Sequence, residues 1–228
     1  VSGLSKRKVQ TIRTFEDHYE YCHYAAGVWG YMITELMQRE GYFNKKQVQD
    51  KLMREPKNWN LGMNPAHDFA LALQLTNDLK DLHKDHEDGI HRWPIKLLEA
   101  KNLTFEQIIS IEKEKPDQNE ARVLYACDVL EIQVEDTIRY IDSATTWLNE
   151  IPYEPAGLRR CWGDALGMSA ATLRTINQAG FFYDDESRKI SREEVAHIDG
   201  IIEDLTAKKK PLGPFISHLL RQPANEYR

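Results

Sequence analysis

The stretch HDFALALQLTNDLKDLHKDHEDGIHRWP, from His67 to Pro94, is apolar in its first half and charged in its second half. An α-helix turns by about 100° per residue, so the amide and carboxylate side chains of this stretch would fall on one narrow stripe. The stripe consists of Gln74, Asn77, Asp81 and Asp85, with Asp78 and Asp88 at its edges. The uncharged flank FALALQL predicts that this helix enters the protein interior and that the chain folds around it.

Two interpretations fit this acidic stripe. Carboxylates on one helical face repel one another, and burying an unpaired charge is costly. A divalent cation such as Mg²⁺ would remove both costs, because hard cations bind carboxylate oxygens together with substrate phosphate oxygens. The alternative is a solvated acidic face balanced by Lys80, Lys84 and His83, since charged stripes are common on surface helices. The spacing alone fits both interpretations equally.

A second patterned segment, YCHYAAGVWG, runs from Tyr21 to Gly30. Glycine lowers helix propensity at an exposed site, so the small residues of this segment favour close approach of another helix or of a ligand chain. These small residues are Ala25, Ala26, Gly27 and Gly30. Aromatic and apolar residues at helical spacing predict a stripe packed in the core. That stripe consists of Tyr21, Tyr24, Val28 and Tyr31.

The two segments together resemble the signature segments of the squalene/phytoene synthase family, the head-to-head trans-prenyltransferases. LQLTNDLKDLHKD followed by GIHRWP is similar to the second aspartate-rich motif of that family, and YCHYAAGVWG is similar to its other signature segment. The resemblance implies an all-α, isoprenoid-synthase-like helical bundle around a central apolar cavity. It matches the C-terminal two-thirds of a family member, and the N-terminal helices of the bundle have no counterpart in the chain.

The resemblance also implies roles for individual residues. Asp81 and Asp85 would bind Mg²⁺ together with Asn77, and Asp81, Asp85 and Tyr21 would be the catalytic residues. Substrate-binding positions would be Tyr21, Gln74, Asn77 and Lys80 beside the diphosphate, with Ala25, Ala26 and Gly30 as the wall of a prenyl-chain tunnel. Lys80 stands where the family usually has arginine, which keeps the charge but loses the bidentate fork. Asp78 stands where the family often has an apolar residue, and solvent exposure is the simplest expectation for it.

The implied reaction is the 1′–1 condensation of two prenyl diphosphates, farnesyl or geranylgeranyl. Mg²⁺ would stabilise diphosphate as a leaving group, and apolar walls would shield the allylic cation from water. NADPH would be required only if the product were squalene. The family has a first aspartate-rich motif on a facing helix, whereas residues 1–20 contain Asp17 alone, so this chain would bind metal from one side. The alternative is a non-catalytic relative that binds a lipid or acts as an assembly factor.

Other candidate site residues rest on weaker patterns. His83, His86 and His91 lie near Asp85 and are potential transition-metal ligands, but positions 83 and 86 fall on a different face from the stripe. Structural zinc sites prefer tighter ligand sets, so we favour Mg²⁺. Loose similarity to the family places Tyr183 and Lys189 in a region with aromatic and basic residues near the diphosphates.

The composition of the 228 residues limits the remaining possibilities. Apolar residues make up 41% and the net charge is −6, which gives no electrostatic reason to bind nucleic acid. No apolar run is long enough to span a bilayer, and three scattered cysteines favour a reducing, cytoplasmic compartment. The run Lys208 to Lys210 is either a solvated helix end or a peripheral contact with a membrane surface. Oligomeric state has no signal in the sequence.

Helical spacing of apolar residues recurs along the chain, and no segment has a convincing strand pattern. The pattern, with capping and punctuating residues, predicts one all-α domain over residues 1–228. Helices are expected at roughly 14–38, 45–54, 65–88, 104–114, 117–149, 156–180, 191–208 and 212–221.

Overall fold

The computed structural model describes residues 12–53, 64–104, 106–107, 120–179 and 189–221. Every regular element in these ranges is a helix, which confirms the predicted all-α class. The predicted helix over 104–114 falls largely outside the described residues. One short helix, α6 (Ile95–Glu99), was not predicted, because five residues are too few to show a period. Within the described ranges no helix has the length and apolarity needed to cross a membrane.

The first long helical segment consists of α1 (Phe15–Cys22), the π-helical turn η1 (His23–Gly27) and α2 (Val28–Arg39). Thr14 and Asp17 form a capping box at its start, and Gly41, with φ +81°, follows its end. A π-turn holds an extra residue, so it rotates the faces of the helix that follows. The predicted core stripe is therefore wrong in part, because Tyr24 is 66% exposed and Val28 is 43% exposed.

Helix α4 (Pro65–Lys80) is the central element of the fold. Pro65 stands in the first turn, where its missing N–H costs nothing, and every residue from Pro65 to Ala72 is buried. The helix packs against α2, against α8 (Glu120–Glu150) and against α9 (Ala156–Ala179). The predicted helix over 65–88 has the right extent but is broken at Asp81, whose φ of −93° and ψ of 17° end α4 before α5 (Leu82–Glu87) begins.

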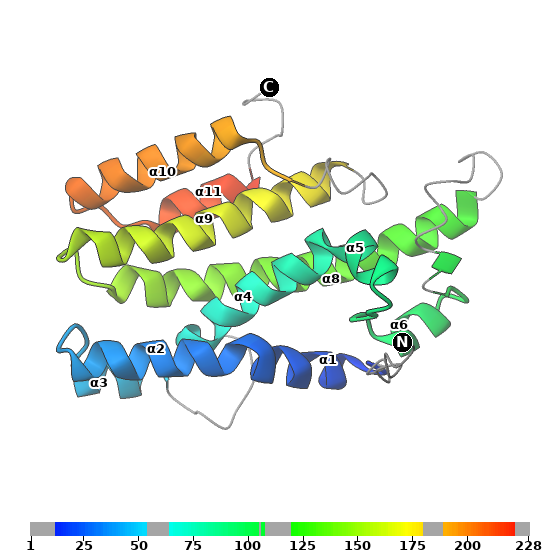
Figure 1. Ribbon diagram of the computed structural model, residues 1–228, viewed down its shortest axis with the longest axis horizontal. Coiled ribbons are helices and arrows are strands. Elements are labelled where there is room, and N and C mark those ends of the chain that lie inside the picture. The colour runs from blue at the N-terminus through cyan, green and yellow to red at the C-terminus, as the bar shows by residue number, and fades with distance from the viewer. Residues whose placement is uncertain (1–11, 54–63, 105, 108–119, 180–188, 222–228) are drawn as a thin grey trace, which may run out of the picture.

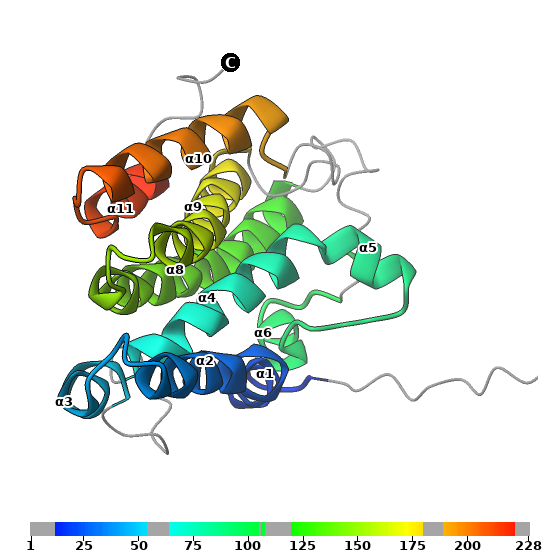
Figure 2. The same ribbon diagram turned by 60° about the vertical axis from the view of Figure 1, so that its left-hand side comes forward.

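The remaining helices form layers on either side of α4. In Figures 1 and 2, α1 and α2 form one outer layer, while α8 and α9 lie across α4 from them. Helices α10 (Arg192–Ala207) and α11 (Gly213–Arg221) pack on the outer side of α9. The short α3 (Lys45–Gln47) continues into the π-helical turn η2 (Val48–Leu52), which contacts α2 and α4.

Small residues allow α2 and α4 to approach closely. A Cβ atom at Gly30 would lie 2.0 Å from the carbonyl oxygen of Ala66, and one at Gly27 would lie 2.3 Å from Nε2 of His67. No real side chain tolerates such contacts. These two glycines therefore serve helix–helix packing, which is one of the two uses that the sequence left open.

An aromatic cluster joins the layers in the core. Phe69 of α4 lies 4.5 Å from Trp147 of α8 and 5.7 Å from Trp162 of α9, measured between ring centroids. The indole Nε1 of Trp147 donates a 2.8 Å hydrogen bond to Oγ1 of Thr34 on α2. Rings of this size bury much apolar surface, so the cluster fixes α4 relative to both neighbouring layers.

One apolar surface of the first segment has no cover within the described residues. We call it the α2 apolar face; it consists of Tyr24, Val28, Trp29, Met32 and Leu36, each between 43% and 66% exposed. Contiguous exposed apolar side chains commonly mark an interaction surface.

Candidate functional site

Asp78 of α4 is the centre of a buried hydrogen-bond cluster. Its side chain is 2% exposed, and its Oδ1 accepts hydrogen bonds from Gln74 Nε2 at 2.8 Å and from Arg92 Nη1 at 2.9 Å. Its Oδ2 lies 3.1 Å from His18 Nε2 and accepts from Cys22 Sγ at 3.7 Å. The expectation that Asp78 faces solvent is wrong, because α1 covers this side of α4.

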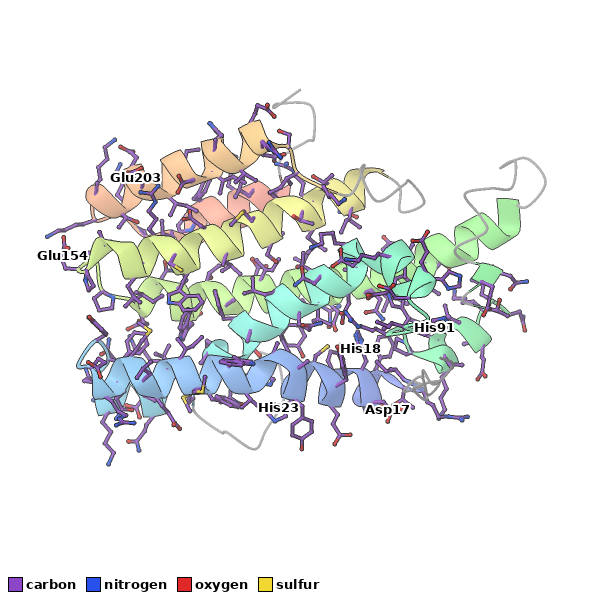
Figure 3. All side chains as sticks on the ribbon, viewed as in Figure 1. Asp17, His18, His23, His91, Glu154 and Glu203 are labelled. Atoms are coloured by element: carbon purple, nitrogen blue, oxygen red, sulfur yellow. The ribbon has the colours of Figure 1, made fainter. Side chains whose placement is uncertain are left out.

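His18 and Cys22 are the parts of this cluster that the sequence analysis missed. They stand four residues apart on α1, so both point from one helical face toward α4. Figure 3 shows His18 on the side of α1 that faces α4, with Asp17 on the opposite side. Their four-residue spacing was the one available signal.

The chemistry of the cluster favours hydrogen bonding over metal binding. One ligand atom from each of His18, Cys22 and Asp78 lies within 4.8 Å of the other two, which is close enough for a metal ion. However, burial, with Asp78 adding to it, raises the pKa of the Cys22 thiol well above its usual range, so the thiol keeps its proton and donates. Arg92 already supplies the positive charge beside Asp78.

Arg92 connects this cluster to the acidic helix and to Tyr21. Its Nη1 lies 2.9 Å from Asp78 and 3.1 Å from Oδ2 of Asp85, and its guanidinium carbon lies 5.8 Å from the centroid of the Tyr21 ring. The two patterned segments of the sequence therefore meet at one guanidinium. Oδ2 of Asp85 is buried and accepts no hydrogen bond of good geometry from the described residues.

Burial and neighbouring charges perturb the ionisable groups around Arg92. Burial raises the pKa of Asp85, Arg92 opposes that rise, and Asp78 and Asp81 add to it. Burial also raises the pKa of Tyr21, with Arg92 again opposing, so Tyr21 is a neutral phenol at pH 7. Asp85 is thus a carboxylate whose charge is costly unless a cation stands beside it.

Asp81 and Asn77 lie in a neighbouring cluster with Lys80. Lys80 Nζ donates a 3.1 Å hydrogen bond to Oδ1 of Asn77 and lies 3.5 Å from Oδ2 of Asp81. Asn77 and Lys80 also border a pocket of about 240 Å³ between α4 and α9. The structure thus places Asp85 beside Arg92, and Asp81 beside Lys80 and Asn77, with the helix broken at Asp81.

A larger pocket of about 720 Å³ lies along α1. Its described lining residues are Ile12, Arg13, Asp17, Glu20, Tyr21, Tyr24 and Ala25. Of the residues expected to form a prenyl tunnel, Ala25 borders this pocket, and so does Tyr21, which was expected beside the diphosphate. Ala26 is half-buried, and Gly30 is buried against α4, so Gly30 is not placed to contact a ligand.

The side chain of His83 and all of Tyr183 lie outside the described residues, and Lys189 is exposed. The rings of His86 and His91 stack with centroids 5.5 Å apart.

Comparisons with known proteins identify the family. The family model described as squalene/phytoene synthase matches residues 4–194. The chain is 30% identical over 99 residues to squalene synthase R6 of a Phoma species, covering 43% of the chain and 21% of that relative. It is 29% identical over 153 residues to the 15-cis-phytoene synthase of Enterobacter agglomerans, covering 67% of the chain and 41% of that relative.

A more distant match is the squalene synthase of Solanum lycopersicum, 22% identical over 161 residues. The matched segments therefore span between about a fifth and two fifths of the length of these relatives. The match of the family model over most of the chain agrees with the all-helical fold. This chain belongs to the squalene/phytoene synthase family.

Proposed function

We propose that this chain forms part of a synthase that joins two prenyl diphosphates head to head. The observation that supports this most directly is the meeting of Tyr21 and Asp85 at Arg92, because it brings the phenol of one patterned segment to the carboxylate and guanidinium of the other. Farnesyl and geranylgeranyl diphosphate are the substrate candidates. A reductant such as NADPH would be needed only for a squalene product.

The carboxylates beside Arg92 fit a divalent cation. Asp85, Asp81 and Asn77 would hold Mg²⁺ through their side-chain oxygens, and Oδ2 of Asp85, which lies 3.1 Å from Arg92 Nη1, would exchange this ion pair for the metal. When bound, Mg²⁺ would supply a Lewis acid for the departing diphosphate. The Tyr21 hydroxyl would donate to a diphosphate oxygen, and its ring would stabilise developing positive charge.

Binding from both sides would need a second set of carboxylates. In this proposal a further segment supplies them. The α2 apolar face, beside Tyr21, offers a surface on which such a segment could pack.

A second candidate is a non-catalytic relative that binds a lipid or a protein partner. It is favoured by the basic partner of each proposed metal ligand: Arg92 pairs with Asp85, and Lys80 pairs with Asp81. Metal binding would have to displace both basic side chains from the aspartates, whereas a non-catalytic relative would keep both ion pairs.

Mg²⁺-dependent release of diphosphate from farnesyl or geranylgeranyl diphosphate separates the two candidates. The full-length parent protein should release diphosphate, and Asp81→Asn or Asp85→Asn should lower the rate by about 100-fold or more, because each removes a charged metal ligand. Asp88→Asn, an exposed aspartate at the end of α5, is the matched control and should keep wild-type activity. Metal-independent release, or full activity of the folded Asp85→Asn variant, would exclude the synthase.

A further inference from the structure

We propose that His67 of α4 is a positioning residue for Tyr21, which it holds in place through His23 and the π-helical turn η1. This inference rests on the proposed function, in which Tyr21 contacts the diphosphate, and it gives a role to a buried histidine outside the clusters around Asp78 and Lys80. Three observations support it: the fit of η1 around the imidazole, the packing that fixes this ring, and the hydrogen bond between the two histidines.

The turn η1 begins and ends at residues that contact His67. Nδ1 of His23, its first residue, lies 3.0 Å from Nε2 of His67. A Cβ atom on Gly27, its last residue, would lie 2.3 Å from the same nitrogen, so only glycine leaves room for the imidazole there. Single π-turns are rare within α-helices and are frequent at functional sites. The extra residue of η1 adapts this helix to the ring that it encloses.

The imidazole of His67 is held from several sides. It is 1% exposed, and the ring of Tyr31 stacks on it with centroids 5.2 Å apart. Its Nδ1 lies 3.8 Å from Oδ1 of the neighbouring Asp68. Ser143 of α8 in turn donates a 2.5 Å hydrogen bond to Oδ2 of Asp68. The ring is therefore fixed within the core and can serve as a rigid anchor for η1.

The hydrogen bond between His23 and His67 supplies what a side chain that only fills space would not. One of the two facing nitrogens carries the proton and the other accepts it, so the contact is directional. Burial, with His67 adding to it, lowers the pKa of His23, which is a neutral imidazole at pH 7. The two residues are 44 positions apart in the chain, so their bond ties η1 to α4.

Tyr21 lies between two such anchors. His18, three residues before it, contacts Asp78 of α4, and His23, two residues after it, contacts His67 of the same helix. The backbone of Tyr21 is continuous with η1, because α1 ends at residue 22 and η1 begins at residue 23. Loss of the second anchor would let the ring shift, and a displacement of about 1 Å near a reacting centre costs on the order of 100-fold in rate.

Kinetics of Mg²⁺-dependent diphosphate release by the full-length protein, from farnesyl and geranylgeranyl diphosphate, test this role. His67→Leu keeps most of the bulk but loses the hydrogen bond, so kcat should fall by about 10- to 100-fold while KM stays near the wild-type value. His67→Gln can bond to His23 through its amide and should recover most of the rate. A role in packing alone predicts the reverse order, because leucine suits a buried site better than glutamine does. His197→Leu, an exposed histidine on α10, is the control and should change neither constant.

Hydrogen–deuterium exchange gives a readout that does not depend on activity. In His67→Leu the amides of η1 should exchange roughly tenfold faster than in wild type, and those of α10 at the wild-type rate. His23→Leu removes the same bond from the less buried partner and should have the same effects, which keeps the test open if His67→Leu does not fold.

The outcomes separate this inference from the proposed function. If wild type releases diphosphate and the folded His67→Leu and His23→Leu variants match it in kcat and in exchange, the role of His67 is overturned while the proposed function stands. The same conclusion follows if His67→Leu is at least as active as His67→Gln. If wild type releases no diphosphate, both are overturned.

Discussion

Asp78 shows how one residue can organise a site whose other members are far apart in the sequence. Its carboxylate contacts His18 and Cys22, which precede it by 60 and 56 residues, and Arg92, which follows it by 14. The buried charge of Asp78 is stabilised by all of its hydrogen-bond donors together. We therefore expect removal of one donor to lower the free energy of unfolding by more than the loss of an ordinary surface hydrogen bond does. The position of Arg92 therefore depends on residues from other parts of the chain.

At the scale of single residues, the buried thiol of Cys22 predicts that the stability of the protein depends on pH. Burial raises the pKa of its thiol far above the unfolded value of about 8.5. Above that pH the unfolded chain loses a proton that the folded protein keeps, so the unfolding free energy should fall as pH rises. The contribution is up to about 1.4 kcal/mol per pH unit between roughly pH 8.5 and 10.

Urea denaturation at pH 7, 8.5 and 10 measures this contribution. Cys22→Ala should show a shallower decline of the unfolding free energy than wild type over the alkaline range. Cys161→Ala is the control, because Cys161 is exposed, and its decline should match wild type. Equal declines in Cys22→Ala and wild type would show that the thiol is not held protonated.

At the scale of elements, the packing of α2 on α4 places the Tyr21 segment beside the acidic helix. The contact depends on Gly27 and Gly30, where a Cβ would collide with α4. At Gly30 the obstacle is a backbone carbonyl, which cannot rotate away as a side chain can. The helices would have to separate to accept any larger residue.

Gly30→Ala should destabilise the protein by about 1–3 kcal/mol, the usual cost of overpacking a well-packed contact. Gly200→Ala is the matched control: Gly200 lies within α10 with nothing within 4 Å of the added Cβ, so alanine should stabilise by roughly 0.5–1 kcal/mol through helix propensity. Chemical denaturation checks both. A Gly30→Ala variant as stable as Gly200→Ala would refute the close contact.

The sequence predicted most helix bounds closely but none of the backbone irregularities within the helices. Helices expected over 156–180 and 191–208 run over Ala156–Ala179 and Arg192–Ala207. Capping residues and periodicity are local signals, so they locate helix ends well. The π-turn over His23–Gly27 and the break at Asp81 left no local pattern. The spacing of apolar residues within one helix does not show where packing against another helix distorts the backbone.

At the scale of the whole molecule, the acidic stripe is divided between two clusters that the sequence could not separate. Helical spacing placed Asp81 and Asp85 on one face, but in the structure Asp81, where the helix is broken, lies beside Lys80, and Asp85 lies beside Arg92. The burial of Asp78 was unpredictable for a related reason. Charge predicts exposure on average, and only the docking of α1 on α4 shows that this carboxylate is enclosed.

At the scale of the whole molecule, our central proposal is that the Tyr21 segment and the acidic helix form a single diphosphate site at Arg92. A double-mutant cycle on Mg²⁺-dependent diphosphate release by the full-length protein tests it most directly, with Tyr21→Leu, Asp85→Asn and the combined variant. Residues that act as one unit are strongly non-additive, so the double variant should be no more than about tenfold slower than the slower single variant. Rate losses that multiply in full would contradict the claim, because they would place Tyr21 and Asp85 in separate sites.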